Sequence, residues 1–158
     1  MQTKLTTEFL ASPSGKTADK VIRSCVHCGF CNATCPTYQL LGDELDGPRG
    51  RIYQIKQILE GAPVTTSLQQ HLDRCLGCRA CETTCPSGVE YHKLLDIGRE
   101  LVEQQVPRSP PQRLQRRLIQ FVFSETARIR PLLSLGRLAR PLLPRSLKKR
   151  IPQLRKLP

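Results

Sequence analysis

The sequence predicts an all-α fold: a helical ferredoxin-type domain with a basic, partly helical C-terminal tail. Three observations support this class. No strand of useful length is indicated anywhere in the chain. The apolar residues between and after the cysteines recur at helical spacing. All eight cysteines lie in two runs of identical spacing, so the domain is organised around them.

The segment before the first cysteine run is expected to be mostly irregular. Residues 1–17 are predicted to be a flexible lead, because residues 12–15 combine serine, proline and glycine as loops do. Asp19 is predicted to cap a short helix through residues 21–22 that leads to Cys25. The segment lacks a charged start followed by an apolar run, so it is not read as a signal peptide.

Both cysteine runs read C-x2-C-x2-C-x3-C-P. This is the spacing of bacterial two-cluster ferredoxins, in which the fourth cysteine of each run ligates the other cluster. On that rule, the eight thiolates hold two [4Fe–4S] clusters. One cluster takes Cys25, Cys28, Cys31 and Cys85, and the other takes Cys75, Cys78, Cys81 and Cys35. The proline after each fourth cysteine favours an extended backbone there and directs the chain away from the loop.

Cysteines at this density have two other common uses, disulfide bonds and zinc sites. Disulfides are disfavoured by the missing secretory signal and by the close, even spacing within each run. A structural zinc site uses four ligands and needs no third cysteine at the same spacing. A zinc-stabilised binding module stays as the minor alternative. Oxygen-sensitive clusters and free thiolates fit a reducing cytoplasm.

The stretch between the runs begins with a predicted short apolar turn at residues 37–41 and a loop at 42–48. A helix is predicted over residues 48–60, where the isoleucines and a leucine fall on one face. Thr66 and Gln69 resemble a capping box that starts a second short helix.

The clearest predicted helix covers residues 90–106 and closes a two-cluster domain spanning residues 18–106. Residues 107–158 are predicted to be a basic, proline-containing tail or linker, with apolar positions at Leu114, Leu118, Phe121 and Val122 and a second leucine-rich piece from 132 to 143 broken by prolines.

The positive charge belongs to this tail. Residues 1–106 contain 11 Lys and Arg against 12 Asp and Glu, a balance of −1. Residues 107–158 contain 14 against one, Glu125, a balance of +13. Basic amphipathic helices bind anionic membrane surfaces or acidic partners; a solvated linker is the equal alternative. No nucleic-acid partner is expected, because the tail has few aromatic residues and no reading motif.

Three stretches, residues 25–31, 35–52 and 71–89, closely resemble the iron–sulfur subunit of bacterial glycolate oxidase (glycolate dehydrogenase). The resemblance covers about residues 20–106 well and continues weakly through the tail. Residues 42–52 with Tyr91-His92 distinguish it from iron–sulfur subunits of succinate dehydrogenase, glycerol-3-phosphate dehydrogenase and heterodisulfide reductase type. Family members continue into a second half with CCG repeats, whereas this chain has no cysteine after Cys85, so it is similar to the amino-terminal portion.

The resemblance implies an electron-transfer subunit that accepts electrons from a partner FAD subunit, which oxidises glycolate to glyoxylate, and passes them toward the respiratory chain. Related flavin-linked complexes, lactate-oxidising ones included, are the alternative. No catalytic residue is expected in this chain, since it has no dinucleotide loop and no flavin site. The resemblance implies a cytoplasmic location, with peripheral contact to the inner face of the cytoplasmic membrane.

Several arginines and histidines also lie near the cysteine runs in the sequence. Arg74 and Arg79 flank the second run and are candidates for stabilising a reduced cluster, with solvated surface positions as the alternative. His27 is expected beside the first cluster or at the surface, and not as an iron ligand. His71 and His92 are expected to be ordinary helix residues. Arg49 and Arg51 either pack against a cluster loop or face water, and the sequence does not decide between the two.

Overall fold

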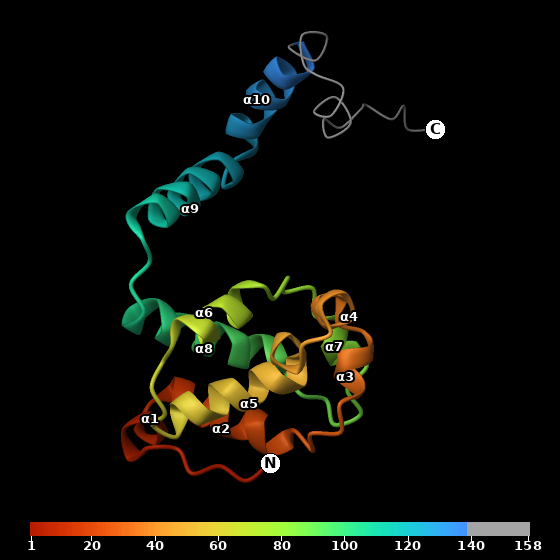
Figure 1. Ribbon diagram of the computed structural model, residues 1–158, viewed down its shortest axis with the longest axis vertical. Helices are drawn as coiled ribbons and strands as arrows, with labels where there is room; N and C mark the ends of the chain where they lie inside the picture. Colours follow the sequence, from red (N-terminus) through yellow and green to blue (C-terminus); the bar gives the residue numbers. More distant parts are fainter. Residues whose placement is uncertain (139–158) are drawn as a thin grey trace. The chain divides into compact units, whose positions relative to one another are not determined.

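The computed structural model describes residues 1–138, which form helices and contain no strand (Figure 1). The predicted all-α class is therefore confirmed for this part of the chain. The chain divides into two units, Met1–Pro107 and Arg108–Pro158, and each is described by itself. The division falls next to the boundary expected between residues 106 and 107.

Helix α8 (Tyr91–Gln105) is the element on which the first unit packs. Helices α2 (Pro13–Ser24), α5 (Pro48–Leu59) and α6 (Thr66–Asp73) all contact α8. Each buries one apolar face, and the fully buried side chains include Ile22, Ile55, Leu59, Leu72 and Leu94. The helices predicted over 48–60 and 90–106 are confirmed to within one residue at each end.

The N-terminal segment is more ordered in structure than a flexible lead. It contains helix α1 (Thr7–Ala11) and the start of α2, and Leu5 is buried in the core. The prediction that Asp19 caps the helix was wrong: Ser12 Oγ accepts the N–H of Gly15 at 2.9 Å and caps α2. Serine followed by proline is a helix start as well as a loop signal, and packing on the core selects the helix.

Short elements surround the cysteine runs. One-turn helices α3 (Phe30–Ala33) and α7 (Ala80–Thr83) occupy equivalent places in the two runs. Helix α4 (Pro36–Leu41) replaces the predicted turn, because Pro36 is well suited to a first helical position. The predicted loop contains the 3-10 helix η1 (Glu44–Asp46).

The cap of α6 also differs from the prediction. Thr65, one residue earlier than expected, is the cap: its Oγ1 accepts the N–H of Leu68 at 3.2 Å. Either threonine fits the sequence pattern, and the extended backbone at Thr65 decides between them.

The described part of the second unit consists of α9 (Pro110–Phe123) and α10 (Thr126–Leu138). Helix α10 continues through Pro131, which was expected to interrupt it. The other expected features of the tail, from residue 139 onward, lie outside the described residues. None of the helices described here is both long and apolar enough to traverse a lipid bilayer.

Candidate metal centres

The two cysteine runs fold in the same way. In the first run His27 and Gly29 have positive φ, at 61° and 88°, and in the second run Gly77 and Arg79 do, at 65° and 60°. These four residues occupy matching positions on either side of the second cysteine of each run. Alternating left-handed residues curl the backbone so that its N–H groups turn toward one side, an arrangement that favours a bound anionic group.

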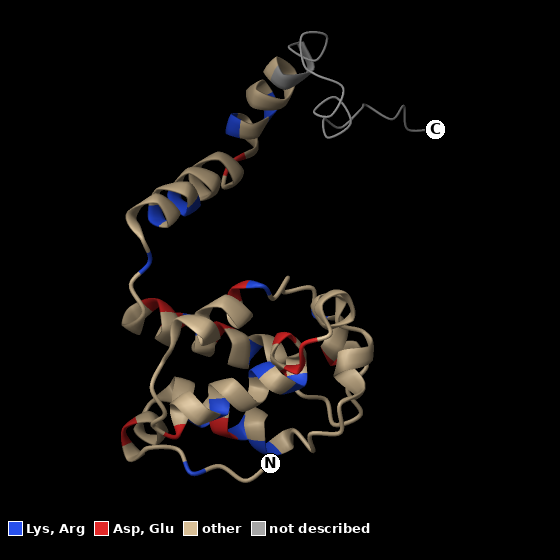
Figure 2. Cartoon of the chain, viewed as in Figure 1, with Lys and Arg blue, Asp and Glu red and all other residues tan. Residues whose placement is uncertain are grey.

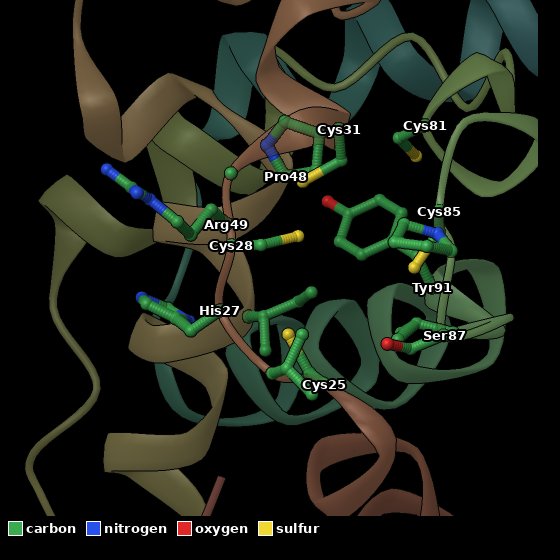
Figure 3. A pocket seen from close by; sticks show the side chains of 15 residues that line it. Cys25, His27, Cys28, Cys31, Pro48, Arg49, Cys81, Cys85, Ser87 and Tyr91 are labelled. Atoms are coloured by element: carbon green, nitrogen blue, oxygen red, sulfur yellow. The ribbon is translucent and has the colours of Figure 1, made fainter.

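The first cavity is lined by the first three cysteines of the first run and by Cys81 and Cys85 of the second (Figure 3). Cys25 and Cys28 lie in the loop before α3, Cys31 lies in α3, and Cys85 lies just after α7. Figure 3 shows their side chains around one opening, with Cys81 at its edge. These are the four residues that the crossed rule assigns to one cluster.

The second cavity has the reciprocal composition. Cys75, Cys78 and Cys81 come from the second run, and Cys35 comes from the end of the first. The structure thus brings together the other four predicted ligands. Each cavity takes cysteines from both runs.

The two cavities share a wall. Cys81, Pro48 and Tyr91 line both of them. A hydrogen bond from Thr34 Oγ1 to the carbonyl oxygen of Ala80, at 3.3 Å, joins the two cysteine runs directly. The loops therefore form one unit that presents two sites.

The donor set fits iron–sulfur clusters. All eight cysteines are free of disulfides. Burial, followed by the charge of Cys25, raises the pKa of Cys31 to about 11. Burial, followed by the charge of Cys75, raises the pKa of Cys81 to about 12. Such crowded thiols become thiolates when a positively charged metal group compensates their charge. A group that takes four thiolates per site accounts for all eight cysteines.

A buried polar network lies behind the second cavity. Asp46 is fully buried, and its Oδ2 accepts Arg74 Nη1 at 2.7 Å, while Oδ1 lies 3.0 Å from His71 Nδ1 and 3.4 Å from Arg51 Nη2. Arg51, also buried, donates from Nε to the carbonyl oxygen of His71 at 2.8 Å and from Nη1 to Thr37 Oγ1 at 3.2 Å. The network ties η1, α5 and α6 to the residues beside Cys35.

Asp46 is charged in this network. Burial alone would raise the pKa of Asp46, but hydrogen bonds with His71 and Arg74 outweigh burial and hold the pKa below its usual value. The carboxylate faces two arginines, and both of its oxygens are already paired with them. Its position near Asp43 and His71 therefore does not make a separate cation site.

Two smaller networks fix the one-turn helices. Glu44 Oε1 accepts from Arg49 Nε at 2.6 Å and from Asn32 Nδ2 at 2.8 Å, which anchors α3. Glu82 Oε1 accepts the backbone N–H of His92 at 2.7 Å and lies 2.8 Å from its Nδ1, which anchors α7 to the start of α8.

The structure places the arginines near the cysteine runs, and His27, in different surroundings. Arg51 is buried, whereas Arg49 is half-exposed beside the first loop. Arg79 lines the second cavity and pairs with Glu82, and Arg74 pairs with Asp46. His27 lines the first cavity, as expected of a residue beside the cluster.

His71 and His92 lie in helices α6 and α8, as expected, but both also have a place beside the second site. His71 is buried in the network around Asp46, and His92 lines the second cavity. The sequence did not indicate the roles of Asp46, Thr37 and Tyr91. Asp46 lies in an acidic segment that is predicted to be a loop, and no spacing in the sequence marks one buried acid among exposed ones.

Comparison with known proteins supports the same chemistry. Residues 21–89 match the 4Fe-4S dicluster domain family. The chain is 59% identical over 152 residues to the glycolate oxidase iron-sulfur subunit of Escherichia coli (strain K12), covering 96% of this chain and 37% of that protein. It is 39% identical over 115 residues to a probable glycolate oxidase iron-sulfur subunit of Bacillus subtilis (strain 168), covering 71% and 26%.

The chain is also similar, more distantly, to an iron–sulfur subunit of another kind. It is 31% identical over 78 residues to the succinate dehydrogenase iron-sulfur subunit of Paracoccus denitrificans, covering 45% of this chain and 30% of that protein. The chain spans between about a quarter and two fifths of the lengths of these three relatives. No solved structure matches it.

Proposed function

We propose that the protein is an electron-transfer iron–sulfur subunit of a glycolate oxidase, because residues 21–89 match the 4Fe-4S dicluster domain family and the chain is similar to glycolate oxidase iron-sulfur subunits. In this role it takes electrons from a partner FAD subunit that oxidises glycolate to glyoxylate and passes them toward the respiratory chain. The observation that carries the proposal is the gathering of all eight cysteines around two adjoining cavities, with both runs contributing to each.

Each cavity would be the site of one cluster, with ligands taken from both runs. Cys25, Cys28, Cys31 and Cys85 would hold the first, and Cys75, Cys78, Cys81 and Cys35 the second. The clusters supply one-electron redox chemistry when bound. The residues of the chain hold them, shield them from water through the core side of each cavity, and set the charge around them.

The similarity to glycolate oxidase subunits extends far beyond the cysteine runs, and this favours glycolate over other 2-hydroxy acids as the substrate of the complex. Because these relatives are named as the iron-sulfur subunits of glycolate oxidase, we assign the flavin to a separate partner subunit. The chain by itself would then carry electrons without oxidising the substrate.

Iron and acid-labile sulfide analysis of the full chain, purified without oxygen, tests the cofactor assignment. We expect about eight iron and eight sulfide per chain. Protein that is folded yet free of iron and sulfide, or that carries zinc, would contradict the proposal. Mixing with the FAD subunit and glycolate should bleach the visible absorbance of the clusters, whereas glycolate alone should not.

The crossed ligation has its own test. Cys28→Ser and Cys85→Ser should alter the same EPR signal, although the two residues lie in different runs. Cys78→Ser and Cys35→Ser should alter the other signal. If Cys85→Ser and Cys78→Ser instead change one shared signal, each run binds its own cluster and the crossed assignment is wrong.

We also propose that α9 makes peripheral contact with an anionic membrane surface on the cytoplasmic side. Its exposed apolar residues Leu114, Leu118 and Phe121 recur at helical spacing, and Arg113 and Arg117 lie beside them. Figure 2 shows the basic residues of α9 grouped along the helix. Apolar insertion combined with attraction to acidic lipids is the usual mode of such helices.

Vesicle sedimentation tests this contact. The full chain should pellet with phosphatidylglycerol vesicles and not with phosphatidylcholine vesicles, and Leu118→Asp should abolish pelleting. Asp96→Asn, which changes the charge on the first unit, serves as the control and should pellet normally. Equal pelleting by Leu118→Asp and the unaltered chain would contradict membrane contact through α9, and failure of the unaltered chain to pellet would favour the linker interpretation.

A further inference from the structure

Tyr91 occupies a position that the cysteine pattern does not foretell. It is the first residue of α8, its ring is 5% exposed, and it lines both cavities. Its hydroxyl donates a hydrogen bond to Cys75 Sγ, with 3.7 Å between oxygen and sulfur. A buried phenol in the shared wall thus contacts a sulfur of the second cavity.

The chemistry of a ligating cysteine sets the direction of this hydrogen bond. A ligating cysteine is a thiolate, which can only accept. The direction of the bond is therefore fixed from oxygen to sulfur.

Thr37 provides a second hydroxyl on the same side. Thr37 Oγ1 lies 3.1 Å from Cys35 Sγ and 2.8 Å from the carbonyl oxygen of Asp46. It accepts from Arg51 Nη1, whose guanidinium is buried. The single hydroxyl proton of Thr37 is donated to the carbonyl oxygen of Asp46, so Thr37 Oγ1 contacts Cys35 Sγ without giving it a proton.

The first cavity contrasts with the second. Cys31 Sγ lies 4.0 Å from Asn32 Oδ1, and this carbonyl oxygen has no proton to give. The amide cannot reverse freely, because Asn32 Nδ2 donates to Glu44 at 2.8 Å. Across the described residues, no side-chain hydroxyl is hydrogen-bonded to the sulfur of Cys25, Cys28, Cys31 or Cys85.

We propose that the hydroxyl of Tyr91 gives the second cluster the higher reduction potential of the two. A donor aimed at a ligand sulfur stabilises the reduced cluster more than the oxidised one, because the reduced cluster is more negative. The Tyr91 hydroxyl is such a donor, and it faces a sulfur of the second cavity. This inference rests on the proposed function, since it requires a cluster in each cavity.

An EPR-monitored redox titration of the anaerobically purified full chain tests the inference. In Tyr91→Phe the higher of the two midpoint potentials should fall, by a shift equivalent to about fivefold to tenfold in the reduced-to-oxidised ratio, tenfold being about 59 mV for a one-electron couple. Tyr53→Phe, a change of the same chemistry on a half-exposed tyrosine of α5, is the control and should leave both potentials in place.

Cysteine variants assign the affected signal. The potential lowered by Tyr91→Phe should belong to the signal that Cys78→Ser alters and Cys28→Ser leaves unchanged. The inference is overturned if the shifted potential is the lower one, if it belongs to the Cys28 signal, or if Tyr91→Phe moves neither potential. Protein with about eight iron and eight sulfide but unmoved potentials refutes this inference alone, whereas protein without clusters refutes the proposed function as well.

Discussion

Backbone conformation at four residues shapes the cysteine loops. The left-handed positions are filled by glycine once in each run, at Gly29 in the first and Gly77 in the second, and by His27 and Arg79 at the other two. A left-handed residue with a side chain costs about 1–2 kcal/mol. Each loop therefore places glycine at one of its two strained positions and tolerates a side chain at the other.

This difference predicts unequal effects of adding a methyl group. Gly77→Ala should lower the free energy of unfolding by about 1 kcal/mol from backbone strain alone, because nothing lies within 4 Å of the added atom. Gly29→Ala should cost more, because the new atom would also lie 2.9 Å from Arg49 Nη1. Thermal unfolding of the cluster-loaded protein compares the two. Gly77→Asn is the matched control and should cost less than Gly77→Ala, since asparagine tolerates this conformation better.

The buried carboxylate of Asp46 is the polar residue on which the network around the second cavity depends. Asp46→Asn leaves two arginines with a neutral partner in a buried place and should cost about 3 kcal/mol of unfolding free energy. Because the pKa of Asp46 is lowered in the folded state, its contribution is present above the ordinary value of 3.8 and is lost as pH falls through the folded value.

Urea unfolding of the loaded protein at neutral pH, followed by circular dichroism, checks this expectation. The exposed Asp96 on α8 gives the control Asp96→Asn, for which a change within about 0.5 kcal/mol is expected. An equally small change in Asp46→Asn would mean that the arginines find other partners.

Among the individual residues of the two sites, the cysteines could be assigned a common role from the sequence, and the residues around them could not. Eight thiols in a fixed spacing have few chemical uses, so their grouping could be predicted without a structure. Asp46, Thr37 and Tyr91 could not, because their roles depend on which side of a turn or helix faces the cavities. That choice is made by packing between segments distant in sequence.

Among the elements, η1 and α5 pack unusually closely. A methyl group on Gly50 would lie 2.0 Å from the carbonyl oxygen of Glu44, a backbone atom that cannot rotate away. On Gly98, in α8, it would lie 2.8 Å from Cγ1 of Ile55, which is a side-chain atom. The first contact fixes the 3-10 turn that carries Asp46; the second sets the spacing of two helices.

The two glycines should therefore respond differently to alanine. Gly50→Ala should displace η1 and destabilise the protein by about 3 kcal/mol or more, and trimming a neighbour should not restore it. Gly98→Ala should cost about 1–3 kcal/mol, and Ile55→Val should recover part of that loss. Melting temperatures of the three variants and the double variant measure this. Rescue of Gly50→Ala by Ile55→Val would show that the assigned contact is wrong.

Helices with regular apolar spacing were predictable, and short elements were not. The periods of α5 and α8 extend over three or more turns, so their limits follow from the sequence. Helices α1, α3, α4 and α7 are at most six residues long and have too few positions to show a period. They are held by prolines, caps and contacts with the core.

At the scale of the whole molecule, the chain separates its cysteines from its positive charge. All eight cysteines lie in the first unit, and the balance of +13 lies almost entirely in the second. We expect a shortened protein of residues 1–107 to retain about eight iron and eight sulfide per chain while losing binding to phosphatidylglycerol vesicles. Metal analysis and vesicle sedimentation on the same preparation check both expectations. Loss of iron from the shortened protein would show that the second unit takes part in holding the clusters.

The exchange of cysteines between the runs has a consequence for assembly. Cys85 of the second run lines the first cavity, and Cys35 of the first run lines the second. Neither site is therefore complete until both loops are in place. Filling one site orders the partner loop and makes the second insertion easier, which is cooperative loading. Native mass spectrometry of partially reconstituted protein should then show chains with no inorganic core and chains with two, and few with one.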